Sequence, residues 1–160
     1  MMPVTLPGKN IFVIFNKNLY SRESGANQCV IMEAKPTFAP QLVIPNGVTD
    51  ISFYIEALGA EEVRRISNND GTIHVSELSI NGTLFHLHEQ TAHSNAVSPV
   101  ANGGSTVTIG LMVDDVHAVM ASAESAGATM TSPVQDYDYG YRQGKFIDPF
   151  GHHWLIEKAI

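Results

Sequence analysis

Short apolar and alternating segments, separated by turn-forming residues, recur along this chain. The first part of the sequence has four of them, at Gln41–Ile44, Glu61–Ser67, Ile73–Ile80 and Thr83–His88. Alternation over four to eight residues is typical of a half-buried β-strand. Between the first two segments, apolar residues recur at helical spacing and Gly59 follows them, where a helix C-terminus favours glycine. The pattern therefore predicts the order β-α-β-β-β.

The same order returns in the second part of the sequence. Residues 93–105 are rich in Ser, Asn, Gly and Pro and are expected to form a linker. Strands are expected at 106–113, 129–134 and 143–147, with a last one from His152. A helix with the stripe Val116, Val119, Met120 and Ala123 is expected between the first two, opened by Asp114 or Asp115 and closed by Gly127.

A constant sequence offset supports an internal duplication. Val48 and Val116 are 68 residues apart, and so are Gly59 and Gly127, while Gly82 and Gly151 are 69 apart. The sequence therefore predicts an α+β fold of two tandem βαβββ modules, at about 38–92 and 104–158, whose curved mixed sheets surround a cleft.

Residues 1–35 do not fit this repeat, and we expect them to form an N-terminal extension before a domain at 36–160. The extension contains one apolar run, Ile11–Phe15, followed by polar residues. This run is either an added strand that pairs with a sheet edge or a neighbouring subunit, or part of a loosely ordered tail.

The last stretch, from Asp136 to Glu157, divides into an aromatic loop, a short strand, the turn Asp148-Pro-Phe-Gly151 and a final strand. Neighbouring side chains on a strand point to opposite faces. His153, Leu155 and Glu157 should therefore share one face, opposite Trp154 and Ile156. The imidazole and the carboxylate on one face are either the start of a site or the polar outside of a hairpin.

Charge and cysteine content narrow the function. The formal net charge of −7 argues against nucleic acid or an anionic membrane as the main partner. Cys29 is the only cysteine, so an internal disulfide is not possible. Ile11–Phe15 is too short for a membrane span or the core of a signal peptide. We expect a cytoplasmic protein.

The paired modules, the Phe53-Tyr54 helix, the Leu-Gly-Ala and Ala-Gly-Ala helix endings, Val113-Asp-Asp-Val116 and Asp148-Pro-Phe-Gly-His-His-Trp154 together resemble the vicinal oxygen chelate superfamily. This superfamily includes glyoxalase I, bleomycin-resistance proteins and extradiol dioxygenases. The aromatic, Gly-containing loop is most similar to a glyoxalase-like branch associated with phosphonate metabolism. The resemblance covers about residues 38–158.

The resemblance implies four metal ligands, one from the first and one from the last strand of each module. In this sequence Thr108 stands where His is usual, and Leu155 stands where Glu is usual. Residues 39–41 offer at most Gln41, a poor ligand. The last strand of the first module offers His86 or His88 as a ligand. In the second module Glu157 lies two residues beyond the position where Glu is usual, on the same strand face. We therefore expect no cofactor beyond a weakly bound divalent metal, whose ligands would be His86, His88 and Glu157.

His86 and His88 alternate with Leu87, so both imidazoles should point to one face and either bind a metal or be partly exposed. Tyr137, Tyr139, Tyr141 and Arg142 could form a recognition edge, because aromatic rings bury area and Arg binds carboxylate or phosphate. Alternatively, these residues form a solvated hairpin end or pack on a second subunit.

Three functions remain open at this point. The first is a small-molecule-binding protein of this superfamily that lacks the full metal-ligand set, with ligand-binding residues Thr108, Tyr139, Tyr141, Arg142, His86 and Glu157. The second is a metal-dependent enzyme of glyoxalase or dioxygenase type with a rearranged His/Glu centre, and the third is an assembly role. The expected partners are a small molecule and a second copy in a homodimer, with neither nucleic acid nor membrane.

Overall fold

Two four-stranded mixed sheets form the framework of the chain. The computed structural model describes residues 36–93 and 95–160. The first module consists of β1 (Gln41–Ile44), α1 (Ser52–Leu58), β2 (Glu61–Ser67), β3 (Ile73–Ile80) and β4 (Thr83–Glu89). The short helix α2 (Pro99–Asn102) follows. The second module consists of β5 (Thr108–Met112), α3 (Val116–Ser125), β6 (Thr129–Tyr137), β7 (Tyr141–Ile147) and β8 (His153–Ala159).

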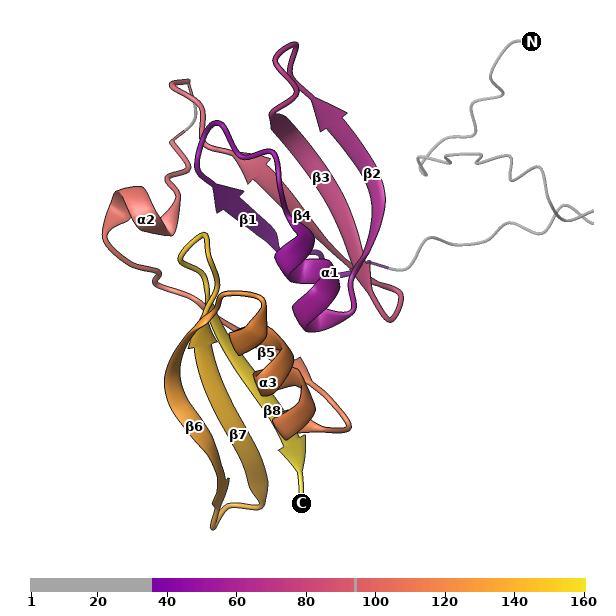
Figure 1. Ribbon diagram of the computed structural model, residues 1–160, viewed down its shortest axis with the longest axis vertical. Helices are drawn as coiled ribbons and strands as arrows, with labels where there is room; N and C mark the ends of the chain where they lie inside the picture. The colour runs from indigo at the N-terminus through magenta and orange to yellow at the C-terminus, as the bar shows by residue number, and fades with distance from the viewer. Residues whose placement is uncertain (1–35, 94) are drawn as a thin grey trace, which may run out of the picture. The chain divides into compact units, whose positions relative to one another are not determined.

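Both sheets have the same topology (Figure 1). The strand order is β1-β4-β3-β2 in one sheet and β5-β8-β7-β6 in the other. In each sheet the first strand pairs in parallel with the last, and the other neighbours are antiparallel. The prediction of two tandem βαβββ modules in an α+β fold is confirmed.

The turn and cap residues act as the sequence indicates. Gly59 ends α1 with φ of 64°, a left-handed conformation that glycine adopts without strain. Asp115 is the N-cap of α3, and its carboxylate accepts a hydrogen bond of 3.0 Å from the backbone nitrogen of Ala118. Asn81 and Gly82 both have positive φ, as a two-residue hairpin between β3 and β4 requires.

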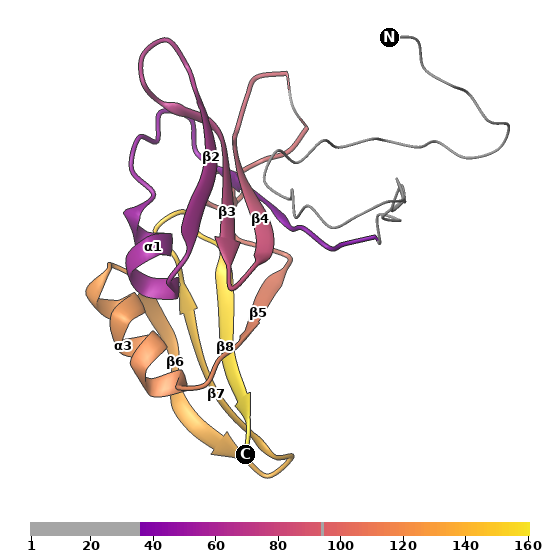
Figure 2. The same cartoon turned by 90° about the vertical axis from the view of Figure 1, so that its right-hand side faces the viewer.

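One hydrophobic core joins the two modules. The helices α1 and α3 lie side by side on the same side of the sheets (Figures 1 and 2). Aromatic side chains make contacts between the modules, because the ring centroids of Phe53 and Phe146 are 6.0 Å apart and those of Tyr54 and Trp154 are 6.3 Å apart. The core therefore fixes the modules to one another and sets the spacing of their first strands.

Two segments differ from the sequence-based expectation. The linker contains α2, because Ser98 caps it through a 3.4 Å hydrogen bond from the Ala101 nitrogen and Pro99 occupies its first turn. The aromatic segment from Asp136 to Tyr141, expected to be a loop, contains only a three-residue turn at 138–140 between two strands. β6 extends to Tyr137 and β7 begins at Tyr141, since cross-strand pairing persists up to the turn.

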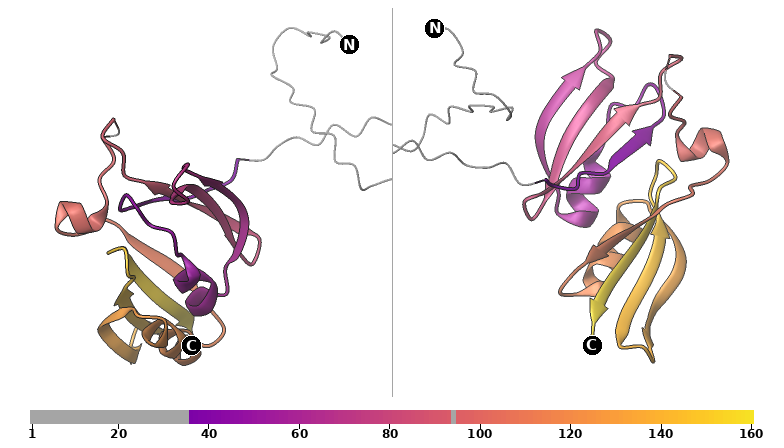
Figure 3. Two further views of the ribbon diagram at one scale, coloured as in Figure 1. Left: turned by 45° about the horizontal axis from the view of Figure 1, so that its top comes forward. Right: turned by 180° about the vertical axis from the view of Figure 1, so that it is seen from behind.

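The sheets are open, so β1 and β2 are edge strands of the first sheet and β5 and β6 of the second. The right-hand view of Figure 3 shows both sheets from behind, with α1 and α3 on the far side of the sheets. No helix among residues 36–93 and 95–160 has the length and apolar character to cross a membrane. The expectations for Ile11–Phe15 and Cys29 fall on residues outside those described, and the domain boundary at 35/36 remains a prediction.

Candidate functional site

Asp148, the first residue of the turn before β8, is a buried carboxylate that holds the two modules together. It accepts hydrogen bonds from the Tyr54 hydroxyl at 2.8 Å, from Trp154 Nε1 at 3.1 Å and from the backbone nitrogens of Phe150 and His152 at 2.9 Å. Burial alone would raise the pKa of Asp148, but the hydrogen bonds and the charge of His152 outweigh it and lower this pKa.

His152 extends this network to the other module. Its Nδ1 lies 3.1 Å from the Asp148 carboxylate, and its Nε2 lies 3.1 Å from the backbone oxygen of Val43 on β1. Both neighbours are hydrogen-bond acceptors, so only the doubly protonated ring donates to both at once. Burial and the neighbouring Asp148 raise the pKa of the Tyr54 hydroxyl well above its ordinary value, which keeps it a donor.

A hollow of about 850 Å³ lies between the edge strands β1 and β5. Its floor includes Trp154 and His152, so the Asp148 network lies directly beneath it. Its walls are mainly apolar and include Leu42, Phe85, Ile109, Leu111 and Met112. Polar groups are few, and among them are Gln41, Asn81 and Thr108. No Asp, Glu, Lys or Arg is found among the described residues that line it.

The rim of this hollow is apolar as well as open. Phe38 is 86% exposed, Val107 is 64% exposed and Met112 is 58% exposed, and all three line the hollow. Pockets for small molecules in proteins are mostly apolar, contain a few orienting polar groups and usually enclose about 300–1,000 Å³. The hollow has these properties, which make it a candidate binding site for a small molecule.

The sheet face of the first module carries the His86–His88 pair. The two ring centroids are 6.1 Å apart, and both side chains lie opposite the buried Phe85 and Leu87, as alternation predicts. Burial, with the charges of His86 and His74, lowers the pKa of His88. His86 pairs across the sheet with Gln41, so this face borders the hollow along β1.

Glu157 does not join the histidine pair within one chain. It lies on β8 of the second module, where it pairs with Met112 of β5. Within 36–93 and 95–160, no three His, Cys, Asp or Glu side chains come close enough together to hold one metal ion. His86, His88 and Glu157 therefore do not form a ligand set in a single copy of the described chain.

The sheet face of the second module carries a row of tyrosines linked to Glu157. The ring centroids of Tyr137 and Tyr139 are 5.0 Å apart, and those of Tyr139 and Tyr141 are 6.2 Å apart. The Tyr139 hydroxyl donates to Gln143 Oε1 at 2.7 Å, and Gln143 Nε2 donates to Glu157 Oε2 at 2.7 Å. A Cβ added at Gly110 would lie 3.4 Å from Glu157 Oε1, so this carboxylate reaches the strand that borders the hollow.

Arg142 is separated from the tyrosines with which the sequence groups it. β7 begins at Tyr141, so Arg142 alternates with Tyr141 and Gln143 and points to the opposite face. Its guanidinium makes two hydrogen bonds to Asp136, at 2.6 and 2.9 Å. This pairing raises the pKa of Arg142 and lowers that of Asp136.

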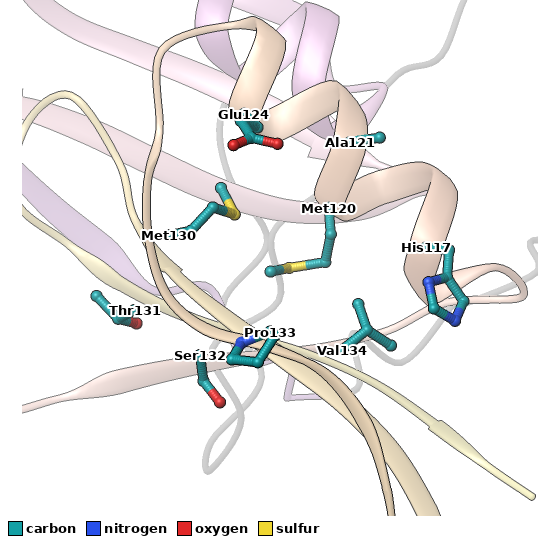
Figure 4. Close-up of a pocket in the computed structure, with 9 residues that line it drawn as sticks. All are labelled: His117, Met120, Ala121, Glu124, Met130, Thr131, Ser132, Pro133 and Val134. Carbon is teal, nitrogen blue, oxygen red and sulfur yellow. The ribbon is translucent and has the colours of Figure 1, made fainter.

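A smaller groove of about 420 Å³ lies between α3 and β6 (Figure 4). Met120 and Met130 both line it, together with His117 and Glu124, and all four are labelled in Figure 4. The groove offers no cluster of polar groups that converge on one point.

Sequence reasoning missed the structural role of Asp148 and His152. The turn pattern assigned Asp148 to a turn position only, and His152 to the start of a strand. A signal was present, because Asp, His and Trp at positions 148, 152 and 154 supply one acceptor and two donors within seven residues. The partners Tyr54 and Val43 lie 94 and 109 residues away in the sequence, so only the assembled fold reveals the network.

Comparisons with known proteins give the family. Residues 49–156 match the family model described as the glyoxalase/bleomycin resistance protein/dioxygenase superfamily. A protein of Mycobacterium bovis, described as uncharacterised, is 35% identical over 132 residues, which cover 81% of this chain and 87% of that protein.

Solved structures show the same fold. A gene product of Arabidopsis thaliana is 27% identical with a TM-score of 0.59, over 79% of this chain and 100% of that one. The fosfomycin resistance protein FosX of Listeria monocytogenes is 16% identical with a TM-score of 0.56, over 80% of this chain and 96% of that one. With its family model matched over most of the chain and its repeated βαβββ topology, the chain belongs to the glyoxalase/bleomycin resistance protein/dioxygenase superfamily.

Proposed function

We propose that this protein binds a small molecule in the hollow between β1 and β5. The observation that carries the proposal is the hollow itself, which has about 850 Å³ of space, mainly apolar walls and a few polar groups. Thr108, one of the residues predicted to bind ligand, lines it. Its mainly apolar walls favour a ligand whose body is largely apolar.

Among the other predicted ligand-binding residues, His86, Glu157, Tyr139 and Tyr141 lie on the two sheet faces that border the hollow, and they extend the proposed site. Gln41 links His86 to the hollow, and Gly110 links Glu157 to it. We leave Arg142 out of the proposed site, because its guanidinium is paired with Asp136 on the other face.

Trp154 provides the test. It is the only tryptophan of the chain and lines the hollow, so its fluorescence reports occupancy without a label. We expect phenylbutanol, a neutral apolar probe, to change Trp154 emission saturably. Thr108→Phe should weaken this binding by filling the hollow. Thr131→Phe is the matched control, because Thr131 is a similarly exposed strand threonine that lies in the groove of Figure 4.

Two results would overturn the proposal. One is an emission that does not respond to phenylbutanol at any soluble concentration. The other is a saturable response that Thr108→Phe and Thr131→Phe weaken equally, which would place the binding outside the hollow.

The second candidate is a metal-dependent enzyme of this superfamily, and the favouring observation is the His86–His88 pair on one sheet face. The described residues of one chain do not fit such a centre, because Glu157 lies in the other module and Thr108 and Leu155 occupy the positions where His and Glu are usual. A catalytic metal needs about three protein ligands and an open position. His86, His88 and Glu157 therefore do not supply a catalytic metal centre within one copy of the described chain.

The purified protein is expected to hold well under one equivalent of tightly bound metal. Two imidazoles bind a divalent ion weakly, because a catalytic or structural site normally needs about three or four protein ligands. Elemental analysis after purification at neutral pH without a tag measures the content. Added zinc or nickel should leave the thermal stability of His86→Ala unchanged. A stoichiometric ion that His86→Ala or Glu157→Ala removes would support the enzyme instead.

We also propose that the protein is a homodimer. Members of this superfamily often form dimers, and within residues 36–93 and 95–160 each sheet ends in two edge strands, which favour pairing with another copy. Register shifts occur in both β2 and β6, but β6 also contains Pro133, whereas β2 exposes Val63 and Ile66. Sedimentation at micromolar concentration should give a dimer, and a monomer alone would contradict the proposal.

The cytoplasmic location and the phosphonate-associated branch remain predictions.

A further inference from the structure

The sheet face of the second module, beside the hollow, carries a negative charge where the sequence suggests a positive one. Arg142 next to three tyrosines suggests recognition of an anion. In the structure that guanidinium lies on the other face, and Asp136 neutralises it through two hydrogen bonds. The charged group that remains beside the tyrosines and closest to the hollow is the Glu157 carboxylate.

Glu157 has no basic partner among the described residues. Its Oε2 accepts from the Gln143 amide at 2.7 Å. Its Oε1 lies against Gly110, which has no side chain to cover it. Lys158 points elsewhere and donates to the backbone oxygen of Asp114 at 2.7 Å. Lys145 shares the face of Glu157, but no ion pair joins the two in the described chain.

The tyrosine row gives this carboxylate an aromatic border. Tyr139 is 59% exposed, and its ring is flanked by those of Tyr137 and Tyr141. Partial burial among the rings, together with Tyr137, Asp138 and Glu157, raises the pKa of Tyr139, so its hydroxyl remains neutral. The faces of neutral aromatic rings attract cations. An unpaired carboxylate beside such rings therefore favours a cation.

We propose that the ligand of this protein is an organic cation with an apolar body. Its protonated nitrogen lies between Glu157 and the ring of Tyr139, and its body passes over Gly110 and Met112 into the hollow. The assignment rests on the proposed function, since it uses the same hollow. The net charge of −7 acts in the same direction, because an acidic protein attracts cations from solution.

Three probes with one body and different charge test this assignment: phenylbutylamine, which is a cation at neutral pH, phenylbutanol, which is neutral, and phenylbutyrate, which is an anion. Titration calorimetry and Trp154 fluorescence both measure binding. We expect the amine to bind about tenfold more tightly than the alcohol, as a half-buried ion pair together with a cation–π contact allows. The anion should bind more weakly than the alcohol.

The variant Glu157→Gln tests the residue. It keeps the size of the side chain and its contact with Gln143, and removes the charge. We expect it to remove the preference for the amine over the alcohol and to leave the affinity for the alcohol unchanged. Glu124→Gln is the matched control, because it makes the same change of net charge at an exposed site on α3 (Figure 4) and should preserve the preference.

The outcomes separate this inference from the proposed function. If the three probes bind equally well, or the anion binds best, the hollow binds small molecules but its ligand is not a cation. If the preference for the amine survives Glu157→Gln, or disappears equally in Glu124→Gln, the assignment to Glu157 is wrong. If none of the probes binds, both proposals fail.

Discussion

Asp148→Ala is expected to lower the free energy of unfolding by about 3–5 kcal/mol, the usual cost of removing one partner of a buried ion pair. The substitution leaves Tyr54, Trp154 and His152 with donors that face an empty space. Because Tyr54 belongs to the first module and the other two residues to the second, the contact between modules is weakened as well. Chemical denaturation monitored by Trp154 fluorescence measures the loss.

Asp138→Ala is the control for this substitution. Asp138 is an exposed carboxylate in the turn between β6 and β7, and its removal should change the free energy of unfolding by less than about 0.5 kcal/mol. Equal stability of Asp148→Ala and wild-type protein would show that the network does not hold the modules together.

The lowered pKa of Asp148 also gives its stabilisation a pH dependence. A carboxyl whose pKa is lower in the folded than in the unfolded protein stabilises the fold above its unfolded pKa. That contribution is lost as the pH falls below about 4, through the folded pKa. Asp50 and Asp136 also have lowered pKa values, so the wild type alone does not isolate Asp148. The stability difference between wild type and Asp148→Asn should therefore shrink in acid.

The elements and the repeat could be predicted because they depend on local rules. Gly59, Asp115 and the Asn81-Gly82 pair act through the conformation or hydrogen bonds of a few neighbouring residues. Alternation correctly gave the faces of Trp154 and Glu157 on β8, because side chains of a strand alternate regardless of what the sheet packs against.

The candidate site could be predicted only in part, because it depends on how two modules meet. Thr108, which the sequence singles out by its position on the first strand of its module, lines the hollow. The hollow itself forms between β1 and β5, which lie more than 60 residues apart and do not pair. The face of Arg142 was missed because the start of β7 was placed two residues late. Once Tyr141 is part of the strand, Arg142 must share a face with Phe146 and not with the tyrosines.

Gly151→Ala is expected to be the most damaging of the glycine substitutions in the turns. Gly151 has φ of 91°, in the left-handed region that costs an L-residue roughly 1–2 kcal/mol. A Cβ at this position would also lie 3.0 Å from Pro99 Cβ and 3.3 Å from the backbone nitrogen of Val100. Backbone cannot move aside as a flexible side chain can, so we expect a total loss of about 2–4 kcal/mol.

Gly71→Ala separates the two causes. Gly71 has φ of 86°, close to that of Gly151, and nothing lies within 4 Å of a Cβ built there. Gly71→Ala should therefore lower the free energy of unfolding only by the cost of the left-handed backbone conformation. The additional loss of stability in Gly151→Ala measures the close contact between the turn and α2. Because Pro99 of α2 also lines the hollow, this contact helps to hold one wall of the hollow in place. Urea denaturation of both variants gives the two values, and equal losses would show that α2 moves away from the turn at no cost.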